Sequence, residues 1–152
     1  MKKSKILVIL CVLSVICVFS RVVDAQGMGA GADTIVQLTE SVFRRGGTSN
    51  VFIVTDEGII VVDGTCNGGG QQWLKEELAR RYDVPVRYVI LSHDHEMHIC
   101  GLQVFEDTAI TVAHRNAFPH IVRENRNTSI PDVTFEESMD IRLGGKTVVL
   151  YY

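Results

Sequence analysis

At 152 residues the chain has room for one domain plus a segment that is removed after synthesis. Hydrophobic residues make up 46% of the sequence and charged residues 22%, proportions that exclude a disordered protein. The net charge of -3 and the lack of a basic stripe exclude a nucleic-acid-binding surface.

The N-terminus has the three-part layout of a secretory signal peptide. Three lysines among the first five residues precede an apolar run at residues 6–19, and Val23-Asp24-Ala25 supplies a cleavage site. The alternative is a membrane anchor, but the run is shorter than the ~20 residues that span a bilayer. We therefore expect residues 1–25 to be cleaved, no stable membrane anchor, and a secreted or periplasmic protein.

Two cysteines, Cys66 and Cys100, remain in the mature chain. An oxidising compartment permits a disulfide between them, although two cysteines do not make a disulfide framework. Cys100 lies among apolar residues and is expected to be buried, whereas Cys66 lies in a loop and is expected to be exposed. Whether the two cysteines pair is left open.

The mature chain begins with a glycine-rich stretch, residues 26–33, that predicts a flexible leader. The expected domain covers residues 34–152. Short apolar runs bounded by turn residues predict four strands, the last of them buried on both faces. These strands are expected at residues 34–38, 42–44, 51–54 and 59–62.

Residues 71–82 predict the clearest helix, because apolar side chains recur there at every fourth position. On its wet side we expect the i, i+4 ion pairs Glu76–Arg80 and Glu77–Arg81, each worth a few tenths of a kcal/mol.

A strand at residues 86–92 follows the helix, so a strand–helix–strand crossover is predicted. Further along, Asn127 begins a glycosylation sequon, and Gly144-Gly145 predicts a hairpin turn. The remaining predicted elements are short helices at 101–106 and 117–125 and strands at 109–113, 139–143 and 147–152.

The segment after the 86–92 strand holds three of the five histidines, His93, His95 and His98, with Asp94 and Glu96 between them. In an extended chain residues two apart point the same way, so His93 and His95 can address one point. If a helix follows, His95 and His98 are also neighbours. The pattern favours a metal site, and the alternative is a polar surface loop.

Several stretches together resemble the metallo-β-lactamase superfamily. They are Asn50 to Val54, the strand that ends at Asp63, the helix, and the run from Leu91 to Gly101, which is similar to the motif H-x-H-x-D-H followed by a glycine three residues on. The resemblance covers about residues 34–152, the N-terminal half of that fold.

The resemblance implies an αββα sandwich, an α/β fold, that holds one or two zinc ions at the edge of its sheets. It implies that His93 and His95 are ligands of the first zinc and His98 a ligand of the second. Asp63 matches a polar residue that supports the ligands from behind.

Two departures from the motif limit this expectation. Met97 occupies the place of the motif aspartate, and a thioether is a poor ligand for Zn²⁺, so one zinc ion is expected and the second site is doubtful. The third histidine of the first site would lie beyond Tyr152, and the chain stops on an apolar strand, so we expect a fragment.

The favoured function is a secreted zinc-dependent hydrolase, in which activated water attacks a carbonyl or ester of a small-molecule substrate. Asp94 and Glu96 are alternative catalytic bases, while His114 and His120 are expected to be structural or exposed. The alternatives are a non-catalytic member with a degenerate metal site and a secreted metal-binding or interaction domain. Expressed alone, residues 26–152 are expected to be poorly soluble or dimeric, because half a sandwich leaves a sheet face uncovered.

Overall fold

The computed structural model describes residues 33–152, so the predicted signal peptide and all but the last residue of the predicted leader lie outside the described part. The helices are α1 (Gly70–Arg81), α2 (Glu96–Ile99), the 3-10 helix η1 (Leu102–Phe105) and α3 (Ala117–Arg123). The strands are β1 (Ile35–Gln37), β2 (Val42–Arg45), β3 (Val51–Val54), β4 (Ile59–Val62), β5 (Val86–Leu91), β6 (Ile110–His114), β7 (Val133–Phe135), β8 (Ser138–Leu143) and β9 (Lys146–Tyr151).

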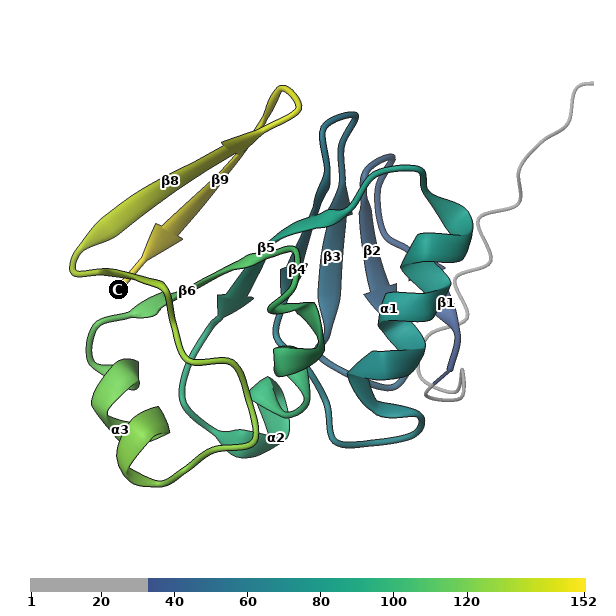
Figure 1. The fold of residues 1–152 in the computed structure, drawn as a ribbon. Coiled ribbons are helices and arrows are strands. Elements are labelled where there is room, and N and C mark those ends of the chain that lie inside the picture. Colours follow the sequence, from purple (N-terminus) through teal and green to yellow (C-terminus); the bar gives the residue numbers. More distant parts are fainter. Residues whose placement is uncertain (1–32) are drawn as a thin grey trace, which may run out of the picture.

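Within these residues the strands form two sheets. The larger sheet has the order β1-β2-β3-β4-β5-β6-β7, and β8 pairs with β9 in a separate two-stranded sheet (Figure 1). Strands β1 to β4 are antiparallel neighbours, whereas β4 to β7 run parallel. The helix α1 connects β4 to the parallel strand β5, which confirms the predicted crossover.

The two faces of the large sheet bury different residues, because side chains alternate along each strand. On one face, Val61 and Val89 pack with α1, η1 and α3 residues in the main core. On the other, Ile60 and Ile90 pack against the β8–β9 hairpin. Strand β4 therefore contributes to both layers and is buried on both faces, as its sequence predicted.

Helix α1 forms where the sequence predicted it, but one of its expected ion pairs is wrong. Glu77 binds both Arg80 and Arg81, and hydrogen bonds from these two residues lower the pKa of Glu77 to about 2. Glu76 instead accepts a hydrogen bond from Gln72. A helix brings i, i+3 and i, i+4 neighbours equally close, so spacing alone could not choose between two carboxylates for Arg80.

The residues that flank the β8–β9 hairpin contact His114, at the end of β6. Nε2 of His114 lies 2.6 Å from the carbonyl oxygen of Glu136, and the His114 ring stacks on Tyr152 at 3.6 Å between centroids. His114 is buried and has a packing role, within the expectation from sequence. Strand β7, which pairs with β6, was not predicted.

The turn between β8 and β9 provides a matched pair of glycines. Both have positive φ, +49° at Gly144 and +71° at Gly145, but only Gly144 faces another segment: a Cβ there would lie 2.5 Å from Oγ1 of Thr55. We expect Gly144→Ala to lower the free energy of unfolding by about 2 to 4 kcal/mol, from backbone strain and overpacking together. Gly145→Ala, with open space around it, should cost about 1 kcal/mol. Urea unfolding measures both, and equal losses would mean that the turn does not pack on Thr55.

Candidate functional site

The histidine segment lies where β5 ends, at the edge of the sheet that α2 borders (Figure 1). His95 is the N-cap residue of α2, and His98 lies in its last turn. The His93 ring is 4.9 Å from the His95 ring and 4.7 Å from the His98 ring, between centroids. The end of a strand and one helical turn thus gather three imidazoles around His93.

Asp63 lies behind this cluster and is linked to it through Ser92. It follows β4, is 7% exposed, and accepts hydrogen bonds from the backbone N–H of Ser92 at 2.9 Å and from its hydroxyl at 2.8 Å. The same hydroxyl oxygen is 2.8 Å from Nδ1 of His93. Parallel pairing of β4 and β5 brings the ends of the two strands together. Asp63 has a φ of 58°, and with this backbone its side chain reaches Ser92 at the end of β5.

This chain of hydrogen bonds selects the tautomer of His93. A carboxylate only accepts hydrogen bonds, so the single proton of the Ser92 hydroxyl is donated to Asp63. The Ser92 oxygen must then accept from Nδ1–H of His93, which leaves the Nε2 lone pair available to a ligand.

The turn between β2 and β3 also reaches the cluster, which sequence reasoning missed. Oγ of Ser49 lies 2.8 Å from Nδ1 of His98. Asn50 donates from Nδ2 to the carbonyl oxygen of Asp63 at 2.6 Å, so the turn is fastened to the end of β4. A serine in a glycine-rich turn carries no signal that distinguishes it from any other turn serine.

The two carboxylates between the histidines lie near a histidine of α3 and an arginine of the segment after it. Asp94 is 3.7 Å from Nδ1 of the half-buried His120, and Glu96 is 3.4 Å from Nη1 of Arg126. Arg126 also pairs with Glu124, whose pKa is held below its usual range by a hydrogen bond from Arg123 and by the charge of Arg126. Glu96, the first residue of α2, is thus an exposed carboxylate that is held in an ion pair.

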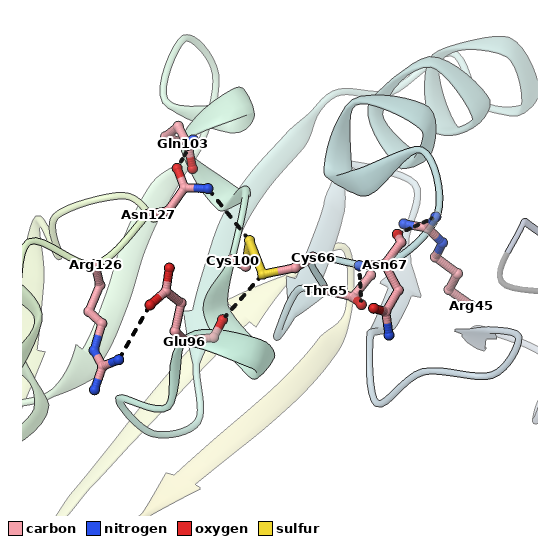
Figure 2. Close-up of a disulfide and its surroundings, with 9 residues drawn as sticks. All are labelled: Arg45, Thr65, Cys66, Asn67, Glu96, Cys100, Gln103, Arg126 and Asn127. Atoms are coloured by element: carbon pink, nitrogen blue, oxygen red, sulfur yellow. Dashed lines mark hydrogen bonds and ion pairs between the residues drawn. A yellow bond between two sulfur atoms is a disulfide. The ribbon is translucent and has the colours of Figure 1, made fainter.

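A disulfide between Cys66 and Cys100 joins the loop after Asp63 to the end of α2 (Figure 2). Cys66 is exposed and Cys100 is buried, as expected, and the pairing that the sequence left open is formed. The same two segments are in backbone contact, because the N–H of Gly64 donates to the carbonyl oxygen of His98 at 2.5 Å.

The comparisons with known proteins agree with this geometry. The profile of the metallo-beta-lactamase superfamily matches residues 44–125, more than half of the chain. The chain belongs to this superfamily. A comparison with curated proteins gives no match.

Solved metallo-beta-lactamases have the same fold. The enzyme from Pontibacter korlensis is 17% identical with a TM-score of 0.68, over 78% of this chain and 60% of that one. The mono-zinc form of FIM-1 from Pseudomonas aeruginosa is 14% identical with a TM-score of 0.57, over 70% and 53%. For IND-7 the identity is 20% and the TM-score 0.59, over 75% and 57%. The predicted fold class is confirmed, and the chain spans between 53% and 60% of these three structures.

The superfamily fold raises the question of whether this chain's residues fit a zinc ion. Imidazole is a ligand that zinc prefers, and His93 offers its Nε2 with two further rings beside it. However, no group of three His, Cys, Asp or Glu side chains within residues 33–152 is arranged to hold a metal ion. Met97, at 71% exposure, lies on the surface. The chemistry of the histidines fits zinc, while a complete set of donors is not formed by the described residues.

Proposed function

We propose that this chain is part of a secreted zinc-dependent hydrolase. In the proposal His93, His95 and a donor from outside residues 33–152 bind one zinc ion, and the substrate is a small molecule with a carbonyl or ester group. The observation that carries it is the hydrogen-bond chain from Asp63 through Ser92 to Nδ1 of His93, which leaves the Nε2 lone pair free on the ring that contacts both other histidines of the cluster. Membership of the superfamily supports the reaction class.

Zinc held by imidazoles lowers the pKa of a bound water to about 7, which supplies hydroxide near neutral pH. The chain's own residues act around it. Asp63 and Ser92 hold the Nδ1 proton of His93 and orient the ring, and Ser49 fixes the ring of His98. Glu96, which is paired with Arg126, and Asp94, which lies beside His120, are the two candidate proton acceptors.

The localisation is also a proposal. The signal-peptide pattern of residues 1–25 supports export, and the Cys66–Cys100 disulfide is of the kind that persists in an oxidising compartment. Among residues 33–152, no helix is both long and apolar enough to cross a bilayer.

Zinc binding tests the proposal directly on protein expressed from the complete reading frame. Free zinc at about one hundred times its dissociation constant should raise the free energy of unfolding by about 2.7 kcal/mol. His93→Ala should abolish this gain. His120→Ala is the matched control, because that half-buried ring contacts Asp94 and Glu124 rather than the other histidines, and it should keep the full gain.

Elemental analysis completes this test. One zinc ion per chain in the purified protein, together with ester or amide hydrolysis, is the expected result. A protein that contains no zinc and is not stabilised by it would overturn the proposal.

A second candidate function is a non-catalytic member of the superfamily. It is favoured by Met97, which stands at the place of the motif aspartate, and by the incomplete donor set of the described residues. Met97→Asp separates the two candidates, with Met97→Leu as the control of similar volume. If metal binding and hydrolysis are absent in the parent and arise only in Met97→Asp, the natural protein has a degenerate site.

A further inference from the structure

The disulfide beside the histidine cluster has two sulfur atoms in different surroundings (Figure 2). Cys66 lies in an exposed loop, whereas Cys100 is 6% exposed and directly follows α2. A thiolate from solution therefore has access to Cys66 and is hindered from reaching Cys100. Solvent access alone would therefore favour attack on the sulfur of Cys66.

A hydrogen-bond donor is aimed at the buried sulfur. Nδ2 of Asn127 lies 3.5 Å from Sγ of Cys100, and Oδ1 of the same amide accepts from Nε2 of Gln103 at 2.8 Å. The Gln103 bond fixes which end of the Asn127 amide faces the sulfur. A donor at this position stabilises a negative charge on Cys100 more than it stabilises the neutral disulfide.

The exposed sulfur has no such donor within the described residues. Sγ of Cys66 instead lies 4.0 Å from the carbonyl oxygen of Glu96. A disulfide sulfur carries no proton, so this approach is a contact rather than a hydrogen bond. A carbonyl oxygen does not stabilise a thiolate, so negative charge is favoured on Cys100 rather than on Cys66.

We propose that Cys66–Cys100 is a thiol–disulfide exchange site with a fixed direction, whose substrates are small thiols and dithiols. The attacking thiolate forms a bond with Sγ of Cys66, the bond between the cysteines breaks, and Cys100 leaves as a thiolate held by Asn127. With a dithiol, its second thiolate displaces Cys66, closing the reagent's own disulfide. Two electrons pass from the dithiol to the protein, and both cysteine thiolates take protons from water.

The exchange site borders the segment that carries the histidines. Cys100 is two residues from His98, so breaking the disulfide removes the covalent tether at the end of α2. The backbone bond from Gly64 to His98 and the buried side chain of Ile99 continue to hold this helix. Reduction is therefore a local change and leaves the fold in place.

Trapping the mixed disulfide tests the direction of attack. The oxidised protein is treated with glutathione in buffer that contains EDTA, quenched with iodoacetamide and mapped by mass spectrometry. Glutathione on Cys66 and carbamidomethyl on Cys100 is the expected result. Glutathione mainly on Cys100, or equally on both, would overturn the proposal.

The rate of attack tests the role of Asn127. Asn127→Ala should react with glutathione about threefold to tenfold more slowly, the range expected from one hydrogen bond to the leaving group. Asn67→Ala is the control, since this amide adjoins Cys66 but makes no side-chain hydrogen bond to either sulfur in the described part of the chain. Gln103→Ala, which frees the Asn127 amide, should slow the reaction by a smaller factor.

Equal rates for Asn127→Ala and Asn67→Ala in the folded state would contradict the assisted departure of Cys100. In denaturing guanidinium all variants should react alike, which separates the effect of the fold from that of the local sequence. The mixed disulfide is trapped in the protein without any substitution, so this experiment tests the direction of attack even if one of the variants folds poorly. Because the experiments contain no zinc, their outcome is independent of whether the protein is a zinc hydrolase.

Discussion

Replacing Arg45 by alanine is expected to lower the free energy of unfolding by about 3 to 5 kcal/mol, from lost hydrogen bonds and a cavity. The side chain of Arg45 is fully buried at the end of β2. Nη1 donates to the carbonyl oxygen of Gly70 at 2.6 Å, and the guanidinium lies over Trp73, 4.8 Å from the ring centroid. It therefore holds the start of α1 and the glycine loop that leads to it.

Two further variants separate the parts of this loss. Asp33→Ala removes a carboxylate that pairs with Arg45 at 2.7 Å but is half exposed, so it should cost less than about 1 kcal/mol. Arg45→Met keeps much of the side-chain volume and should lie between the other two variants. Urea unfolding measures all three, and an equal loss for Asp33→Ala and Arg45→Ala would place the energy in the ion pair rather than in the loop contacts.

Replacing Asp63 by alanine is expected to cost about 2 to 4 kcal/mol and to release the ring of His93. Two hydrogen bonds from Ser92 lose their acceptor, and alanine is strained at the φ of 58° that aspartate tolerates. With the Ser92 hydroxyl free to rotate, the Nδ1–H tautomer of His93 is no longer selected.

Asp63→Asn is the matched control for backbone strain, because asparagine also tolerates positive φ. It keeps one acceptor and should cost about half as much. Urea unfolding gives the free energies, and nitrogen NMR of the histidine rings reports the tautomer. Retention of a single Nδ1–H tautomer of His93 in Asp63→Ala would show that Ser92 does not transmit the effect of Asp63.

The local patterns of the chain were sufficient to predict most of its helices and strands. The fourfold spacing in α1, the apolar runs of β3 and β4 and the glycines between β8 and β9 each correspond to an observed element. Strand β7 was missed because its three residues follow Pro131 and include only one partly buried side chain, so no alternation was visible. An edge strand of this length forms because β6 offers it a partner.

The same distinction between local pattern and long-range contact applies to the candidate site. The sequence by itself determined the approach of His93 and His95, since residues two apart in an extended segment point the same way. The contact of His93 with His98, five residues on, depends on how the chain turns from β5 into α2. Only the tertiary structure decided the contacts of Ser49 with His98, Arg45 with Gly70, and Cys66 with Cys100. These partners are 49, 25 and 34 residues apart, and such contacts depend on the order of the strands and the path of the loops. Periodicity reports only on neighbours within one turn or one pleat, so it carries no information about them.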